Sequence, residues 1–529
     1  MASLLVVRAS GHLSDDQRRY PQWETTNAEL KRLLEAGIGG VILLGAGAPE
    51  LRLRTDQLRR WAHGPVLLCA DVEEGVGQRF EGLSWLLPPL ALGRLHGKDP
   101  AQAVALAEAY GGCTGREARR VGLNGVLAPV CDVNNNPANP VINVRAWGED
   151  PATVSALVAA FSRGLQRQGV LGCAKHFPGH GDTDVDSHLA LPRLNHGRER
   201  LEAVEFPPFR AALAADIAAV MSAHLLLEPL DPQRPATLSR AVLHDLLRRD
   251  LGFEGLVITD ALVMEAISAR HGAGEAVVLA LEAGADLALM PADPWEAITA
   301  VEAALEGGRL QEAALRRSAA RRLEALERFA APPIDHPQLE AGPIAEDRHL
   351  AETLVRRTLV GHGEGRGVPA GSGAGTPGLN LIRIDRSLAC PFLSTNAPAL
   401  VMPQHHGFRP CLLAGDGVSP CRAQPEAPLD LERLGNGPVL LQLFVRGNPF
   451  RGEAGSGEPW PAAVRQLLDA GRLAGLAVFG SPDLWDSLEP LLPPDLPAAY
   501  SPGQMPLAQQ HLLAALGLGT LSAAGDFTD

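Results

Sequence analysis

Short runs of apolar residues recur through the first 291 residues, and each ends in a polar or glycine-rich turn. Most are separated by segments rich in Ala, Leu, Arg and Glu in which apolar residues recur at helical spacing. The apolar runs lie at 3–8, 40–46, 65–70, 125–130, 170–174, 218–223, 255–259 and 286–290, and the helical segments include 101–121, 151–168, 200–215 and 240–251. Near-continuous apolar runs are typical of parallel strands buried on both faces. Eight strand–helix units predict an α/β protein whose first part is a (β/α)8 TIM-type barrel.

A second region follows the barrel pattern. The last helical tract ends near residue 328, and the proline-rich sequence Ala-Ala-Pro-Pro-Ile-Asp-His-Pro comes next. Beyond it the pattern predicts helices at 346–359, 462–470 and 505–516, a Gly/Pro/Ser-rich loop at 361–378, and apolar runs at 379–384, 398–402, 438–445 and 474–479. We therefore predict a catalytic barrel over 1–330, a linker over 331–345 and a smaller open α/β sandwich domain over 346–529.

Composition narrows the possible partners. The 529 residues carry a net charge of −14, which disfavours binding to nucleic acid or to an anionic membrane. No apolar stretch approaches the roughly 20 residues that span a bilayer, and the N-terminus lacks the basic segment of a secretory signal. The seven cysteines form no CxxC pair, which favours buried thiols in a reducing compartment. We expect a cytoplasmic protein, monomeric or homodimeric, that acts on a small molecule.

Polar residues follow five of the predicted strands. They are Asp71, Asp132, Lys175 with His176, His224 and Asp260. In a barrel these positions meet at the C-terminal rim, where barrel active sites lie. The alternative is that strand ends are polar only because they meet solvent.

The densest chemistry lies in residues 175–188, where one Lys, three His and three Asp occur within fourteen residues. A proline and two glycines in this stretch argue against a helix and predict a loop. The whole chain contains only three lysines, so Lys175 indicates a need for a compact ammonium group at this point.

Two carboxylates and one imidazole suggest glycosidase chemistry. A retaining glycosidase needs a carboxylate nucleophile and a proton donor on opposite sides of the anomeric carbon. Asp260, directly after an apolar run, suits the first role, although a lone Asp there is also typical of a cap or an ion pair. Asp186 and His188 suit the second, because a carboxylate that accepts the imidazole N–H fixes its tautomer and raises the basicity of the other nitrogen.

A metal site is the rival interpretation of the same loop. His176, His180 and His188 could bind zinc together with one Asp. The run Asp182-Thr-Asp184-Val-Asp186 also resembles the start of a calcium loop, but its sixth position is Ser187 and its twelfth is Arg193, so the calcium spacing fails. The spacing leaves zinc open.

The motif Lys-His-Phe-Pro-Gly-His-Gly-Asp-Thr, followed by Asp-Ser-His, resembles the signature loop of the β-N-acetylglucosaminidases of glycoside hydrolase family 3. Further matching segments follow in order along residues 40–291, and the second region resembles the family's C-terminal α/β domain. These segments are Asp71-Val-Glu-Glu-Gly-Val-Gly-Gln-Arg79-Phe, Ala-Pro-Val-Cys-Asp132-Val-Asn, Arg145-Ala-Trp-Gly-Glu-Asp-Pro151, Ser222-Ala-His224, Pro235-Ala-Thr-Leu-Ser239, Ile-Thr-Asp260-Ala-Leu and Ala-Gly-Ala-Asp286.

The resemblance implies a retaining exo-β-N-acetylglucosaminidase that removes N-acetylglucosamine, as in the recycling of peptidoglycan-derived muropeptides. It implies that Asp260 is the nucleophile and that Asp186 and His188 form the acid/base dyad. The residues that would hold the sugar hydroxyls are Asp71, Arg79, Arg145, Lys175 and His176. A structural ion pair is the alternative for Arg79 and Arg145, whereas His180 and His224 are expected to be scaffold. We expect no cofactor and no metal.

The chain departs from the family pattern at two places. Where relatives have two adjacent glycines, it has Glu73-Glu74-Gly75, which puts the roles of Glu73 and Arg79 in doubt. After the second strand it has Leu44-Gly-Ala-Gly-Ala in place of an aromatic and polar pair, so one wall of the sugar pocket is expected to differ.

Three alternatives to hydrolysis by this dyad stay open. A histidine base adds no negative charge, so phosphate could replace water and make the protein a β-N-acetylglucosaminide phosphorylase. The others are a metal-dependent barrel hydrolase and an inactive sugar-binding protein.

Overall fold

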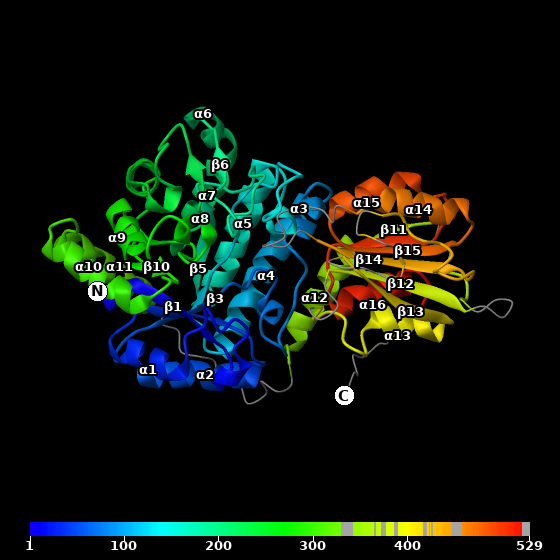
Figure 1. Cartoon of the computed structure of the whole chain (residues 1–529), viewed down its shortest axis with the longest axis horizontal. Coiled ribbons are helices and arrows are strands. Elements are labelled where there is room, and N and C mark those ends of the chain that lie inside the picture. The colour runs from blue at the N-terminus through cyan, green and yellow to red at the C-terminus, as the bar shows by residue number, and fades with distance from the viewer. Residues whose placement is uncertain are drawn as a thin grey trace. The chain divides into compact units, whose positions relative to one another are not determined.

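The computed structural model describes residues 1–329, 342–363, 367–371, 377–385, 390–415, 421–422, 424, 427–446 and 458–520. The chain forms two compact units, the first running from Met1 to Ala351 and the second beginning at Glu352 (Figure 1). Residues 331–341 of the predicted linker lie outside the described residues. The domain boundaries given above therefore stay predictions.

The first unit contains the predicted barrel. Eight parallel strands are ordered β10-β1-β2-β3-β4-β5-β7-β9, and a bridge between Ile258 and Leu287 closes the sheet. The strands are β1 (Leu5–Ser10), β2 (Gly40–Leu44), β3 (Leu67–Ala70), β4 (Gly125–Val126), β5 (Leu171–Phe177), β7 (Ala219–Ser222), β9 (Leu256–Ile258) and β10 (Ala288–Leu289). A separate parallel pair joins β6 (Arg193–Leu194) to β8 (Leu226–Leu227).

Helices separate the strands of the barrel in sequence (Figure 1). They are α1 (Asn27–Glu35), α2 (Ala48–Trp61), α3 (Leu90–His96), α4 (Pro100–Arg120), α5 (Pro151–Gln166), α6 (Arg198–Arg200), η5 (Leu201–Glu205), α7 (Phe206–Ala214), η7 (Ala241–Asp250), α8 (Glu265–Ser268), α9 (Ala273–Ala283), α10 (Pro294–Glu306) and α11 (Glu312–Arg328). Two of the predicted helical segments contain π-type turns, in η5 and η7. Nowhere in the described part of the chain is a helix both long enough and apolar enough to cross a bilayer.

The dipeptide Asp-Pro starts three of the barrel helices. The side chains of Asp99, Asp150 and Asp293 accept hydrogen bonds from backbone N–H groups in the first turns of α4, α5 and α10. In each helix the following proline occupies a position whose N–H would have no partner within the helix. The sequence therefore fixes these helix starts locally, and with them the loops that lead from the strands.

The inside of the barrel is apolar up to the strand ends. Inward residues such as Val6, Ile42, Cys69, Leu171 and Ile258 are buried in one cluster. Toward the carboxyl ends the inward positions become polar, as expected for a barrel whose chemistry lies at that rim.

The second unit is an α/β sandwich. Its sheet is ordered β11-β16-β15-β14-β12-β13 and is parallel except for β11. The strands are β11 (Val360–His362), β12 (Gly378–Ile384), β13 (Phe408–Ala414), β14 (Val439–Val445), β15 (Leu473–Gly480) and β16 (Ala498–Ser501). The helices are α12 (Ala345–Thr358), which begins in the first unit, and α13 (Pro398–His405), α14 (Trp460–Asp469), α15 (Pro482–Leu488) and α16 (Pro506–Ala515).

Side chains of β14 alternate between two cores. Leu441 and Leu443 pack with residues of α14 and α15, whereas Leu440 and Phe444 pack with residues of α13 and α16. Figure 1 shows these helix pairs on opposite faces of the sheet. The fold class predicted from the sequence is confirmed for this unit as well.

Several details of the second unit differ from the expectation, and among them strands β11 and β16 were not predicted. The apolar run 398–402 lies in helix α13, where Pro398 takes the first helical position. Strand β13 was not predicted, because it is an edge strand that carries Pro410 and pairs only with β12. Residues 364–366 and 372–376 of the predicted loop lie outside the described residues.

Candidate active site

The rim of the barrel carries the predicted polar residues. Asp71 directly follows β3, Asp132 lies beyond β4, and His224 and Asp260 lie two residues beyond β7 and β9. Lys175 and His176 lie within β5 and not on the following loop, which corrects the expectation that the whole stretch 175–188 is a loop.

An irregularity in β5 explains how it presents two neighbouring polar side chains. Its pairing with β7 runs from Ala174 opposite Val220 to Phe177 opposite Ser222, so β5 has one residue more than its partner over this interval. An extra residue of this kind bends a strand and re-aims its side chains. Lys175 thereby reaches the loop after β3, while His176 reaches the loop after β4.

Lys175 belongs to a network of four charged residues, of which Asp71 is exposed and the other three are largely buried. Its Nζ donates to Oδ1 of Asp71 at 2.8 Å and lies 2.6 Å from Oε1 of Glu73. Arg145 donates to both carboxylate oxygens of Glu73, from Nε at 2.7 Å and from Nη2 at 2.9 Å. The Lys175 and Glu73 side chains are 2% and 6% exposed, whereas that of Asp71 is 43% exposed. Asp71 is thus the member of this network that a ligand reaches most easily.

The charges of this network support one another. Burial alone would raise the pKa of Glu73, but Arg145 and Lys175 hold it well below its ordinary value. Burial would likewise lower the pKa of Lys175, yet Asp71 and Glu73 raise it. Glu73, Arg145 and Lys175 are therefore charged at neutral pH, in a fixed geometry that suits hydrogen bonding to hydroxyl groups.

Asp132 holds His176 in place. Its Oδ2 lies 2.8 Å from Nδ1 of His176, and its Oδ1 accepts the backbone N–H groups of His176 and His180 at 3.2 and 2.7 Å. The His176 contribution outweighs burial and lowers the pKa of Asp132. Since an ionised carboxylate only accepts, Nδ1 of His176 carries a proton.

Asp186 and His188 meet as the sequence predicts. Oδ1 of Asp186 accepts both the backbone N–H and Nδ1–H of His188, each at 2.8 Å. The Asp186 side chain is fully buried, and that of His188 is 22% exposed. The arrangement fixes the orientation of the His188 ring.

Asp260 lies within electrostatic reach of three histidines. Burial would raise its pKa, but His224, His176 and His188 lower it to about 2. Its Oδ1 accepts the N–H of Ala261 at 2.7 Å. The carboxylate is therefore ionised at neutral pH.

His224 has a scaffold position. Its Nε2 donates to the carbonyl oxygen of Ala261 at 2.9 Å, and its Nδ1 contacts Oγ1 of Thr237 at 2.8 Å. Burial lowers the pKa of His224. The contact at Ala261 fixes the backbone next to Asp260.

Two residues differ from their expected places. Arg79 is exposed, and its Nε donates to the backbone oxygen of Asp71 at 3.0 Å. Glu73 was not among the predicted site residues, yet it holds both Arg145 and Lys175. Its position two residues after Asp71 could have indicated a role in the site, but the altered glycine pattern of this segment made that role uncertain. Arg145 therefore forms an ion pair, as the alternative interpretation predicted, and its partner Glu73 also contacts Lys175.

The loops after β4 and β5 are in close contact. Nδ2 of Asn139 donates to the carbonyl oxygens of His180 and Gly181 at 2.8 and 2.9 Å. A Cβ atom on Gly181 would lie 1.8 Å from the carbonyl oxygen of Val133. The position therefore requires glycine.

Among the described residues, side chains that could bind a metal ion together lie away from the 175–188 stretch. The one group of three whose donor atoms lie within 4.8 Å of one another is Cys113, Glu117 and Asp347, all buried. Two of its members already have protein partners, since Arg116 pairs with Asp347 and Ser84 donates to Glu117. None of the histidines of the 175–188 stretch belongs to this group.

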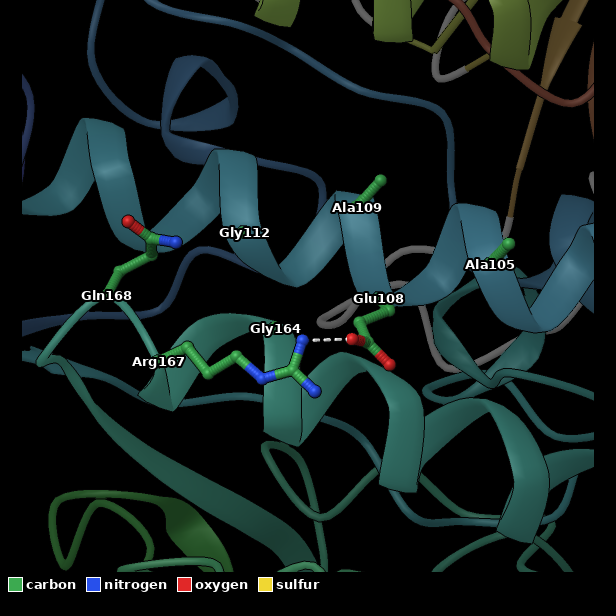
Figure 2. Close-up of a pocket in the computed structure, with 7 residues that line it drawn as sticks. All are labelled: Ala105, Glu108, Ala109, Gly112, Gly164, Arg167 and Gln168. Atoms are coloured by element: carbon green, nitrogen blue, oxygen red, sulfur yellow. Dashed lines mark hydrogen bonds and ion pairs between the residues drawn. The ribbon is translucent and has the colours of Figure 1, made fainter.

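A pocket of about 410 Å³ lies between α4 and α5, away from the rim residues. Figure 2 shows Glu108 of α4 facing Arg167, and an ion pair joins them. The pocket is lined by Ala105, Glu108, Ala109, Gly112, Gly164, Arg167 and Gln168. None of the predicted site residues lines it.

Comparison with protein families gives two matches. Residues 3–325 match the glycosyl hydrolase family 3 N terminal domain, and residues 372–517 match the bacterial glycosyl hydrolase family 3 C-terminal domain.

Individual relatives agree with these matches. A β-hexosaminidase of Stenotrophomonas maltophilia (strain K279a) is 37% identical over 271 residues, which are 50% of this chain and 80% of the relative. The structure of a glycoside hydrolase family 3 β-N-acetylglucosaminidase from Paenibacillus sp. str. FPU-7 is similar with a TM-score of 0.74 and 28% identity, over 97% of this chain and 95% of that one. The β-glucoside phosphorylase BglX has a TM-score of 0.75 at 20% identity, over 98% of this chain and 91% of that one, which shows a shared fold alone.

Proposed function

The chain belongs to glycoside hydrolase family 3, and on that premise we propose that it is a retaining exo-β-N-acetylglucosaminidase. Its substrate is a β-linked glycoside with a terminal non-reducing N-acetylglucosamine, of the kind found in peptidoglycan-derived muropeptides. The names of the relatives described above, β-hexosaminidase and β-N-acetylglucosaminidase, support this choice of sugar. The cytoplasmic location and the monomeric or homodimeric state stay predictions.

The observation that carries the proposal is the contact between Asp186 and His188 near an ionised Asp260. In the first step Asp260 bonds to the anomeric carbon while the bond from that carbon to the leaving oxygen breaks. Doubly protonated His188 gives its Nε2 proton to the leaving oxygen. A covalent glycosyl-enzyme and a neutral His188 result.

The second step reverses these roles. Neutral His188 takes a proton from water, the water oxygen bonds to the anomeric carbon, and Asp260 leaves as a carboxylate. Asp186 remains ionised and stabilises the imidazolium whenever it forms. Two displacements at the same carbon retain its configuration.

The charged network around Glu73 holds the sugar in this proposal. Asp71, Arg145, Lys175 and His176 bind ring hydroxyls, and Arg79 binds at the exposed edge. A substrate that lacks one of these hydroxyls leaves a buried polar group without a partner, which lowers its affinity.

Phosphorolysis is the second candidate, because the dyad presents a neutral base to the incoming nucleophile. The Asp186 side chain is fully buried and accepts Nδ1–H of His188, so the group that meets the incoming nucleophile is the imidazole. The first steps of hydrolysis and phosphorolysis are identical.

One assay tests sugar class and reaction class together. An aryl N-acetylglucosaminide and the matching aryl glucoside are incubated with and without phosphate. We expect cleavage of the N-acetylglucosaminide at a rate independent of phosphate, with free sugar as product. Sugar 1-phosphate as the main product would instead establish the phosphorylase, and no cleavage of either substrate would favour an inactive sugar-binding protein.

A second assay tests the dyad. His188→Ala should lose little activity on a nitrophenyl glycoside, whose leaving group needs little protonation, and much more on a phenyl glycoside. Equal loss on both substrates would contradict the assigned role of His188.

A further inference from the structure

His180 binds the loop that carries the dyad at two points. Its Nδ1 lies 2.7 Å from Oγ1 of Thr183, and its Nε2 lies 3.1 Å from Oγ of Ser187. The His180 residue is 2% exposed. A histidine ring thus spans the loop from its beginning to the residue between Asp186 and His188.

The hydrogen bonds of this ring are consistent with one tautomer. In the tautomer that carries its proton on Nδ1, the Thr183 hydroxyl accepts from Nδ1–H and donates its single proton to the carbonyl oxygen of His180 at 3.1 Å. Burial lowers the pKa of His180 to about 4, which makes the ring neutral at pH 7. In this tautomer Nε2 accepts the proton of the Ser187 hydroxyl at 3.1 Å.

The ring also connects the dyad to the rest of the rim. The backbone N–H of His180 donates to Oδ1 of Asp132, whose other oxygen contacts His176. Ser187, at the far end, has Asp186 on one side and His188 on the other, and all three lie in a short turn closed by hydrogen bonds to Asp186. Holding Ser187 therefore restricts the backbone on both sides of it.

From this geometry we propose that His180 is a positioning residue for the acid/base dyad, acting through Ser187. The inference rests on the function proposed above. His180 exchanges no proton with substrate; it keeps the Ser187 turn in the conformation in which Asp186 accepts from His188. Its loss impairs protonation of the leaving group and leaves attack by Asp260 intact.

Two isosteric variants separate the two contacts. In His180→Gln the amide reaches the position of Nε2, where its oxygen accepts from Ser187. In His180→Asn the amide reaches the position of Nδ1 and binds Thr183 alone. The variant Ser187→Ala removes the same contact from the other side and supplies the test if His180→Asn folds poorly.

The readout is kcat/KM for phenyl divided by kcat/KM for nitrophenyl N-acetylglucosaminide. This ratio does not depend on the folded fraction of a preparation. We expect His180→Asn and Ser187→Ala to lower it about tenfold, since small displacements of a catalytic group cost that much or more, while His180→Gln stays within about threefold of the parent. His244→Gln, a half-exposed histidine on η7, is the matched control.

Combining His180→Asn with His188→Ala completes the test. The double variant should have the same ratio as His188→Ala, because a positioning residue has no effect once its target is gone. Equal losses on both substrates in His180→Asn, or a further drop of the ratio in the double variant, would overturn the inference. If His188→Ala itself leaves the ratio unchanged, the proposed dyad fails, and that result is distinct from a failure of His180 alone.

Discussion

Arg145 binds both carboxylate oxygens of Glu73, whose Oε1 also lies 2.6 Å from Nζ of Lys175. Glu73→Gln removes the negative charge that these two cations share. We expect kcat/KM to fall about 100-fold, since breaking a buried ion pair leaves uncompensated charge. Steady-state kinetics on an aryl N-acetylglucosaminide measures this. Glu81→Gln, at an exposed position nearby in sequence, should change nothing, and a loss below about threefold in Glu73→Gln would show that Asp71 alone holds Lys175.

Removal of Asp260 should abolish turnover. In Asp260→Ala no carboxylate remains to form the glycosyl-enzyme, and we expect kcat to fall by at least about 10³-fold on every glycoside. The variant should stay folded, because the Asp260 carboxylate accepts a hydrogen bond from the adjacent N–H of Ala261 and is not part of the apolar core. Comparable activity in the folded variant would rule out this residue as the nucleophile.

The pH profile should separate the nucleophile from the acid. Burial would raise the pKa of Asp260, but three histidines lower it to about 2. Two of them, His224 and His176, remain in His188→Ala, so the carboxylate should stay ionised above about pH 4 in that variant. In His188→Ala with a nitrophenyl substrate, kcat/KM should therefore be flat from about pH 4 to 8. A remaining acid limb near pH 5 in that variant would mean that another group titrates in the first step.

Through Glu117, the free energy of unfolding should fall as the pH rises, whereas a carboxylate with a lowered pKa would make it rise. Burial and the nearby Asp347 raise its pKa to about 7, despite hydrogen bonds from Ser84. Between the unfolded value of about 4.3 and 7, only the folded state holds the proton, so stability falls as pH rises through that window. Glu117→Gln has no proton to lose. We expect its Tm to exceed that of the parent by about 3 °C at pH 8 and to match it near pH 4.5.

An exposed carboxylate provides the comparison for this effect. Glu302→Gln, on the outer surface of α10, should leave Tm unchanged at both pH values. If Glu117→Gln is less stable than the parent at pH 8, the Glu117 carboxylate is stabilised by its partners and its assigned titration is wrong.

Chelation should leave activity unchanged. No histidine of the 175–188 stretch belongs to the group of three metal-ligating residues that the described part of the chain brings together. Dialysis against a chelator, followed by the aryl glycoside assay, checks this. Activity lost on dialysis and restored by zinc would revive the metal-dependent alternative.

Local sequence signals predicted the barrel and much of the rim. Near-continuous apolar runs indicated the eight strands, and motifs placed polar groups where those strands end. Asp186 and His188 were predictable as a pair because only one residue separates them. The Glu73–Arg145 contact was not, since its partners lie 72 residues apart and only the closed barrel brings their loops together.

Other differences also have physical causes. The extra residue in β5 depends on its pairing with β7, which no local pattern records. In the second unit, β13 has a mixed burial pattern typical of an edge strand, so it lacks the apolar run of a central one. The run 398–402 is too short for its period to distinguish strand from helix.

The close approach of Gly181 to the backbone of Val133 limits which segments of this protein can be replaced by those of a relative. Because a Cβ there would overlap the carbonyl oxygen of Val133, the segments around 131–139 and 178–188 form one interlocking module. A chimera that receives only the second segment from a homologue inherits a backbone shaped for a different neighbour. Transferring both segments together keeps the close contact between Gly181 and Val133. The two segments should therefore be exchanged as a pair.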